Sequence, residues 1–134
     1  MRSLARECVF KYIFSRLFNP GDEGLFAVLN KDLSDSSKEF SEQLLAAVDK
    51  NFDEYLIKIE SLSVGYALSR IRNADKCAII IGMAELDNFV DTPIPVIIDQ
   101  AVSLAAKYST ENSTDFVNGI LAQYVKEKNN GKDY

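Results

Sequence analysis

The sequence predicts a compact all-α protein, and three observations carry that prediction. Hydrophobic residues make up 47% of the 134 residues, which is a globular composition. They recur at the i, i+3 and i+4 spacing of one helix face, within segments of helical length. The Val and Ile runs lie inside these segments rather than in short alternating strands. The length suits one core, so residues 1–134 are expected to form a single domain of about six or seven helices.

The first helix is expected from about Ser3 to Phe18, where the breaker NPGDEG follows. Two rows of residues at i, i+4 spacing are expected to face inward: Leu4, Cys8 and Tyr12, and Ala5, Val9 and Ile13. Phe10, Phe14 and Phe18 form a second stripe, rotated well away from the first. Two apolar stripes on one helix fit either a central helix or a helix that meets a partner.

A short helix is expected next, at Leu25–Leu33. Ser36 and Glu39 have the spacing of a capping box, which predicts one long helix over about Lys38–Ile59. The segments SVGYALSRIR and ADKCAIIIGMAELDNF follow as further helical stretches. The apolar run Cys77–Ala84 marks the second of them as the most buried helix.

Two helices complete the chain. Pro93 suits the first turn of one, with Asp91 or Thr92 as its cap. The last helix follows STENSTDFVNG, with Asn112 or Ser113 as its N-cap. Gly119 inside this helix costs about 1 kcal/mol relative to Ala, and close approach of another helix is one reason that would justify it.

Composition argues against catalysis. The chain has no His, which removes Ser-His and Cys-His nucleophiles and the commonest metal ligand. Glycine-rich nucleotide fingerprints and the HExxH pattern are absent, and Cys8 and Cys77 are expected to be buried free thiols. No enzyme activity, cofactor or metal is therefore expected. Apolar runs are too short for a membrane span and the N-terminus is a poor signal peptide, so a cytoplasmic protein is expected.

Charge points to a binding role instead. The net charge is −5, but residues 1–18 carry four basic residues and one acidic residue. A basic first helix on an acidic body can bind a polyanion at one face, although a merely solvated basic face explains the charge equally well. The helix start in STENSTDFVNG can accept phosphate through free N–H groups. Phe116 beside it is either a core residue or a ring that stacks on an unpaired base.

The segment IDQAVSLAAKYSTENSTDFVNGILAQ resembles the C-terminal signature of the NusB family of transcription antitermination factors. ARECVFKYIFS resembles the opening helix of that family, and ADKCAIIIGMAEL resembles its central helix. The resemblance implies two packed helical subdomains. It also implies binding of a short single-stranded boxA element in nascent ribosomal RNA, together with the small-subunit ribosomal protein NusE. That assembly loads the antitermination complex onto RNA polymerase.

The resemblance also implies roles for individual residues. The positions expected to contact RNA are Arg2, Arg6, Lys107, Glu111, Asn112, Ser113, Phe116 and Asn118. Within this set, the cationic residues are expected to contact phosphates, Phe116 to stack on a base and Asn118 to be a polar anchor for the RNA. The positions expected to contact NusE are Phe14, Phe18, Asp75 and Glu85. Asn112 departs from the family, which has an acidic residue there, and Ile80 and Ala84 replace the family's Arg and Tyr.

Two other interpretations remain open at this point. A helical protein–protein interaction module without RNA binding explains the aromatic stripe and the acidity. An enzyme fragment is the other, because NusB-like domains also occur ahead of RNA cytosine methyltransferases; this chain has no room for such a catalytic domain. The phenylalanine stripe also makes a homodimer plausible.

Overall fold

A computed structural model describes residues 2–65 and 67–129 of the chain. These residues form α-helices joined by short turns, with one short 3-10 helix and no β-strand among them. The elements are α1 (Arg2–Phe18), α2 (Leu25–Leu29), α3 (Asp35–Lys50), α4 (Phe52–Leu62), η1 (Leu68–Arg70), α5 (Asn73–Asn88), α6 (Ile94–Tyr108) and α7 (Ser113–Lys128). The predicted all-α class is therefore confirmed.

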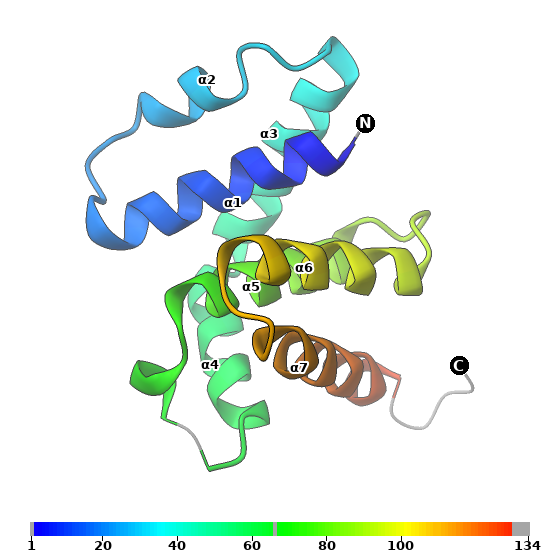
Figure 1. Cartoon of the computed structure of the whole chain (residues 1–134). Coiled ribbons are helices and arrows are strands. Elements are labelled where there is room, and N and C mark those ends of the chain that lie inside the picture. The colour runs from blue at the N-terminus through cyan, green and yellow to red at the C-terminus, as the bar shows by residue number, and fades with distance from the viewer. Residues whose placement is uncertain (1, 66, 130–134) are drawn as a thin grey trace.

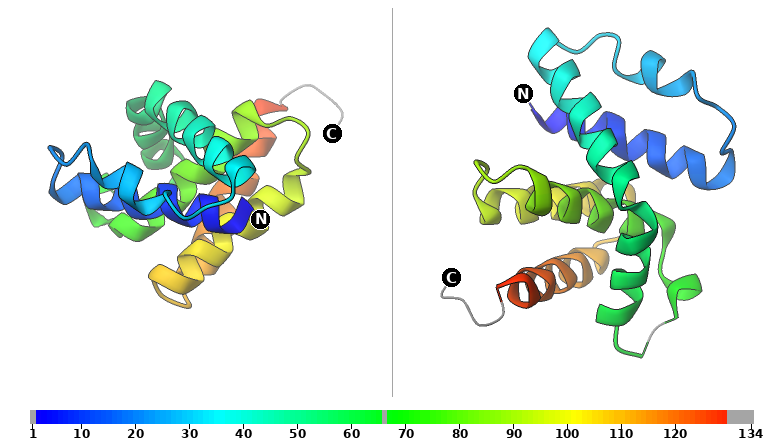
Figure 2. Two further views of the ribbon diagram at one scale, coloured as in Figure 1. Left: turned by 90° about the horizontal axis from the view of Figure 1, so that it is seen from above. Right: turned by 180° about the vertical axis from the view of Figure 1, so that it is seen from behind.

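The helices form two groups that share α5. Helices α1, α2 and α3 lie together in the upper part of Figure 1, and α4, α6 and α7 surround α5 below them. Helix α5 contacts α1, α3, α4, α6 and α7, and the views in Figure 2 place it between the two groups. The two packed subdomains implied by the family resemblance are present.

Helix α5 is central because almost every side of it is apolar or small. Each residue from Cys77 to Ala84 is buried, as the continuous apolar run predicts. Gly82 allows the closest approach: a Cβ built there would lie 2.7 Å from Leu121 Cδ1 and 3.4 Å from Ala101 Cβ. A Cβ at Gly119 would meet nothing within 4 Å. Close approach of another helix therefore does not account for Gly119, whereas it does account for Gly82 in α5.

Helix α1 is buried along part of its length and leaves apolar side chains exposed at its C-terminal end. Phe10 is 2% exposed and stacks on Tyr108 with ring centroids 4.8 Å apart. The ring contacts continue outward through Phe14 to Phe18, which is 66% exposed. Leu4, expected to face inward, is 60% exposed because the other helices do not cover the end of α1 at that position.

The predicted helix over Lys38–Ile59 is two helices. Asn51 leaves the helical conformation with φ −128° and ψ 27°, so the chain turns between α3 and α4. The turn lets α3 pack on α1 and α5 while α4 packs on α5 and α7. The N-cap of α3 is Ser34, whose Oγ accepts a hydrogen bond from the Ser37 N–H at 3.3 Å, and not Ser36.

Three other boundaries differ from expectation. Helix α2 ends at Leu29, and only Leu68–Arg70 of SVGYALSRIR is helical among the described residues. Pro93 is the N-cap position of α6 rather than a residue of its first turn. The start of α7 agrees with expectation: Asn112 is its N-cap position, although the Asn112 side chain makes no capping hydrogen bond.

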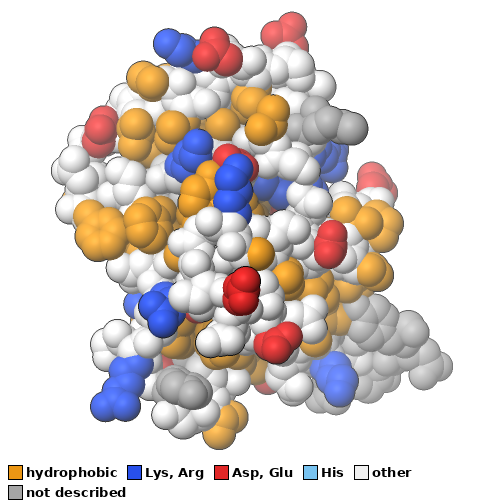
Figure 3. Space-filling model, viewed as in Figure 1, with side chains coloured by type: hydrophobic (Ala, Val, Ile, Leu, Met, Phe, Trp, Pro, Cys, Tyr) orange, Lys and Arg blue, Asp and Glu red, His pale blue; other side chains and the backbone are white. Residues whose placement is uncertain are grey.

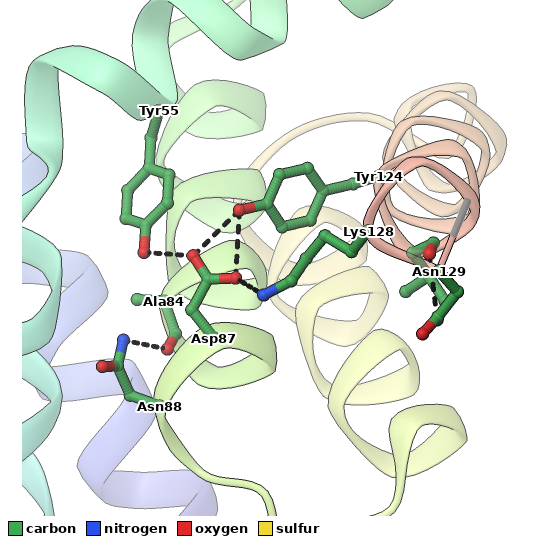
Figure 4. Close-up of polar contacts among 8 residues, drawn as sticks. Tyr55, Ala84, Asp87, Asn88, Tyr124, Lys128 and Asn129 are labelled. Atoms are coloured by element: carbon green, nitrogen blue, oxygen red, sulfur yellow. Dashed lines mark hydrogen bonds and ion pairs between the residues drawn. The ribbon is translucent and has the colours of Figure 1, made fainter. Parts of the chain in front are cut away.

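A polar cluster around Asp87 joins α4, α5 and α7 (Figure 4). The Tyr55 hydroxyl donates to Asp87 Oδ2 at 2.7 Å, and the Tyr124 hydroxyl donates to the same oxygen at 2.8 Å. Lys128 pairs with Oδ1 of the same carboxylate. Burial and the hydrogen bond to Asp87 raise the pKa of both tyrosines, so their hydroxyls remain donors at neutral pH. The cluster therefore ties the C-terminal half of α7 to α4 and α5.

Candidate functional site

A pocket of about 340 Å³ lies where the segment after η1 meets the starts of α5 and α7. Its lining combines two cations, hydroxyl and amide groups, one carboxylate and one aromatic ring. These residues are Arg70, Ile71, Arg72, Asp75, Thr110, Asn112, Ser113 and Phe116. Four of them were singled out from the sequence as binding residues: Asp75, Asn112, Ser113 and Phe116.

The arginines of the pocket were missed by the sequence analysis. Ile71 has an extended backbone with φ −83° and ψ 133°, so successive side chains point to opposite sides. Ile71 is 7% exposed, and Arg70 and Arg72 on either side of it are exposed. The usable signal was the alternation Arg-Ile-Arg, which the helical interpretation of SVGYALSRIR concealed. The alternation places two positive charges at the same pocket.

Ser113 and Asp75 form the floor of the polar side of the pocket. The Ser113 hydroxyl donates to Asp75 Oδ2 at 3.0 Å and lies 2.9 Å from Thr110 Oγ1. Both side chains are buried, at 4% and 5% exposure. Ser113 therefore ties α7 to α5 rather than capping its helix. The Ser113 hydroxyl is thus already hydrogen-bonded inside the protein, and its direct contact with RNA stays a prediction.

Phe116 lies between the core and the pocket. It is half-buried and packs against the hydrophobic core cluster. It also lines this pocket and a second hollow between α4 and α7, where Val64 is 89% exposed. Phe116 thus contributes to the core, and its stacking on an unpaired base stays a prediction.

The other RNA positions expected from the sequence lie outside the pocket lining, except Asn112. Glu111 and Asn118 are exposed, and Asn118 lines a separate hollow between α6 and α7. Lys107 Nζ lies 3.0 Å from both carboxylate oxygens of Glu7, and the Tyr108 hydroxyl donates to Glu7 at 2.7 Å. Burial would raise the pKa of Glu7, but the hydrogen bonds from Tyr108 and Lys107 lower it, so this carboxylate is charged at neutral pH. Lys107 therefore stands next to a negative charge while its side chain remains 59% exposed.

Arg6 and Glu85 correct two expectations. Arg6 Nε lies 2.5 Å from Glu85 Oε1, and a second hydrogen bond of 2.9 Å joins Arg6 Nη2 to Glu85 Oε2. Arg6 is 4% exposed and Glu85 is 1% exposed. The pair therefore joins α1 to α5 inside the protein, and neither residue meets RNA or a partner protein in this conformation. Arg2 is exposed and lies over the Phe40 ring at 4.4 Å.

Phe14 and Phe18 mark a different surface. Figure 3 shows hydrophobic side chains gathered over the C-terminal part of α1 and over α2. Leu17, Phe18 and Val28 are the exposed large hydrophobic residues of these two helices near that end. Basic side chains on this face lie in separate places rather than in one continuous patch. The described residues thus offer, among other features, an exposed apolar surface and a small cationic pocket.

Other kinds of site have less support. Residues 2–65 and 67–129 contain no group of three or more side chains suited to hold a metal ion. Within the same residues, no helix is long and apolar enough to cross a membrane. Cys8 and Cys77 are free thiols, as expected, although only Cys77 is fully buried.

Comparison with known proteins agrees with this architecture. The family model described as NusB family matches residues 3–126. The transcription antitermination protein NusB of Natranaerobius thermophilus is 28% identical over 98% of this chain and 99% of its own length. A solved structure of T. maritima NusB is 32% identical, with a TM-score of 0.84, and covers 95% of this chain and 92% of that chain.

A third likeness concerns the fold alone. A chain in the structure titled "Crystal Structure of Antitermination Factors NusB and NusE in complex with dsRNA" is 23% identical with a TM-score of 0.82. It covers 94% of this chain and 96% of that chain. With the family match over almost the whole sequence, the protein described here belongs to the NusB family.

Proposed function

We propose that this protein is a transcription antitermination factor that binds boxA-type single-stranded RNA together with the ribosomal protein NusE. The observation that carries the proposal is the pocket at the start of α7, where Arg70, Arg72 and Phe116 meet in a chain of the NusB family. In this role the protein catalyses no reaction. It works in the cytoplasm, where it helps to assemble the antitermination complex on RNA polymerase.

The pocket chemistry suits an unpaired nucleotide. Arginine binds phosphate oxygens through several donors, and phosphate contacts position an RNA strand without reading its sequence. A half-buried ring such as Phe116 offers a face for a base, and such stacking needs a base outside a duplex. Arg2 and Lys107 are also exposed, outside the pocket, and are further candidates for phosphate contacts. The pocket therefore supplies both elements of single-strand binding.

The apolar surface at the end of α1 suits the protein partner. Phe18 is 66% exposed and Val28 of α2 is 58% exposed. A basic ribosomal protein also complements a chain with a net charge of −5. Such a partner adds positive charge to the complex, so RNA affinity should rise when NusE is present. Self-association through this surface would give the homodimer and would compete with NusE.

The first test is an RNA titration. A boxA-type oligonucleotide is titrated by fluorescence anisotropy at several salt concentrations, with and without NusE. We expect weak binding alone, a clear gain with NusE and a loss of affinity as salt rises. Arg70→Ala and Arg72→Ala should each lower the slope of log K against log salt by about 0.7, whereas Lys126→Ala on the far end of α7 should not. Absence of RNA affinity at low salt with NusE present would overturn the proposal.

Phe116 and Phe18 should separate the two binding functions. Phe116→Ala should weaken RNA binding about tenfold because a stacked base loses its aromatic face, and Phe116→Tyr should retain the affinity. Phe18→Ala should weaken NusE binding and leave the RNA affinity of the isolated protein unchanged. Thermal unfolding of each variant checks that the fold is intact. A folded Phe116→Ala variant with unchanged RNA affinity would rule out the stacking role.

The second candidate function is a helical protein–protein interaction module without RNA binding. The observation that favours it is the exposed apolar surface of α1 and α2, which lies apart from the cationic pocket. In that case NusE or another protein would bind, and the arginine variants would have no effect on any RNA titration.

A further inference from the structure

One carboxylate oxygen in the pocket is unexplained by the fold. Asp75 is in the first turn of α5 and is 5% exposed. Its Oδ2 accepts the Ser113 hydrogen bond, but its Oδ1 is buried and has no hydrogen-bond partner among the described residues. A buried acceptor without a donor destabilises a protein, and such groups are rare enough to need a reason.

The pocket contains hydrogen-bond donors, but none of them donates to Asp75 Oδ1. Arg70, Arg72 and Asn112 line the same pocket as Asp75, yet none of them makes a hydrogen bond or ion pair with it. An arginine paired with Asp75 would have neutralised the carboxylate and filled the space. Instead the carboxylate stays beside an open volume of about 340 Å³, which lies in the range of pockets that hold small ligands.

We propose that Asp75 Oδ1 accepts a hydrogen bond from the Watson–Crick edge of one unpaired base held in this pocket. The donor is an amino or imino N–H of the base, the ring of Phe116 supports the base, and Arg70 and Arg72 contact its phosphates. This inference rests on the proposed RNA-binding function and adds a reading residue to it. It moves Asp75 from the protein-partner surface, where the family resemblance suggested it, to the RNA site.

The arrangement makes the pocket selective in two ways. A base within a duplex has its Watson–Crick donors occupied, so the carboxylate admits only an unpaired nucleotide. A carboxylate also accepts but cannot donate, so it favours a base edge that presents N–H groups. Since Oδ1 is covered in this conformation, the base must displace neighbouring side chains as it enters.

Asp75→Asn is the informative variant, because it changes the donor pattern with little change in shape. The Asn oxygen can still accept from Ser113, and the Asn amide then presents a donor where Oδ1 was an acceptor. Thermal unfolding of the variant checks that it is folded. Asp115→Asn is the matched control: it loses one carboxylate charge near the site, is exposed, and does not line this pocket.

The experiment selects single-stranded RNA from a random pool of dodecamers, with NusE present, using wild type, Asp75→Asn and Asp115→Asn. We expect wild type and Asp115→Asn to select the same motif. The motif selected by Asp75→Asn should differ from it at one position, where the base preference is lost or replaced by another. A synthetic RNA in which the N–H donor at that position is methylated should bind wild type about tenfold more weakly. The same RNA should bind Asp75→Asn no more weakly than its unmethylated form.

Each other result overturns the inference in its own way. Identical motifs for wild type and Asp75→Asn would show that Asp75 reads no base, while the arginine-dependent RNA binding of the proposed function still stands. Loss of NusE binding by Asp75→Asn with an unchanged RNA motif would assign the oxygen to the protein partner. No enrichment of any RNA by wild type would remove the proposed function and this inference together.

Discussion

Replacing Glu85 with alanine should lower the free energy of unfolding by about 3–5 kcal/mol. Glu85 is 1% exposed and makes two hydrogen bonds of 2.5 and 2.9 Å to the buried Arg6 guanidinium. Removing the carboxylate leaves a positive charge inside the protein, where it can neither lose its proton nor reach water. The shift of the urea midpoint at constant m-value measures this loss.

Two further variants test whether the buried charge is the cause. Glu85→Gln keeps the shape and one acceptor but removes the negative charge. Its free energy of unfolding should therefore lie between those of wild type and Glu85→Ala. The double variant Arg6→Met with Glu85→Leu removes both charges and should recover most of the stability, since apolar residues often replace a buried ion pair without cost. A loss below about 1 kcal/mol for Glu85→Ala would mean that Arg6 reaches solvent, contrary to its 4% exposure.

Gly82→Val should lower the free energy of unfolding by about 3 kcal/mol, because the new side chain has no space. A Cβ at this position would already lie 2.7 and 2.9 Å from the two terminal carbons of Leu121. Leu121 is fully buried, so its side chain cannot turn toward solvent to make room. Thermal unfolding should show a clearly lower midpoint for the variant, together with an unchanged helical circular dichroism spectrum at low temperature.

The rescue variant makes this test specific. Combining Gly82→Val with Leu121→Ala returns volume to the same contact, so the double variant should lose less than the two single variants added together. Gly119→Ala serves as the opposite control, because a Cβ there meets nothing within 4 Å. It should raise stability by about 0.5–1 kcal/mol through helix propensity alone. Strict additivity of the Gly82 and Leu121 changes would show that these residues do not press on each other.

The local patterns of the sequence were sufficient for most of the helices. The first helix, the buried central helix and the last two helices follow from apolar spacing and breaker residues within short windows, and the structure contains them with small shifts of their ends. The family resemblance also came from such local runs. These features depend on residues that are close together in the chain, so they can be predicted from the sequence alone.

The boundary at Asn51 shows where local patterns stop being enough. The apolar face continues through this residue, so a single helix over Lys38–Ile59 was the natural expectation. The turn lets α3 pack on α1 and α5 while α4 packs on α5 and α7, and these contacts are not visible in a local pattern. The Arg-Ile-Arg segment is similar: its alternation becomes meaningful once Ile71 packs inward and a pocket exists beside it.

The functional residues divide along the same line. The sequence by itself determined an all-α chain of the NusB family, with Phe116 beside a polar helix start. The packing of distant helices sets a further difference: Arg2 is exposed whereas Arg6 is buried, although both are basic residues one helical turn apart. Glu85, which is 79 residues away in the chain, makes the difference. Burial of a charge depends on what the fold places opposite it, and periodicity along one helix holds no information about that partner.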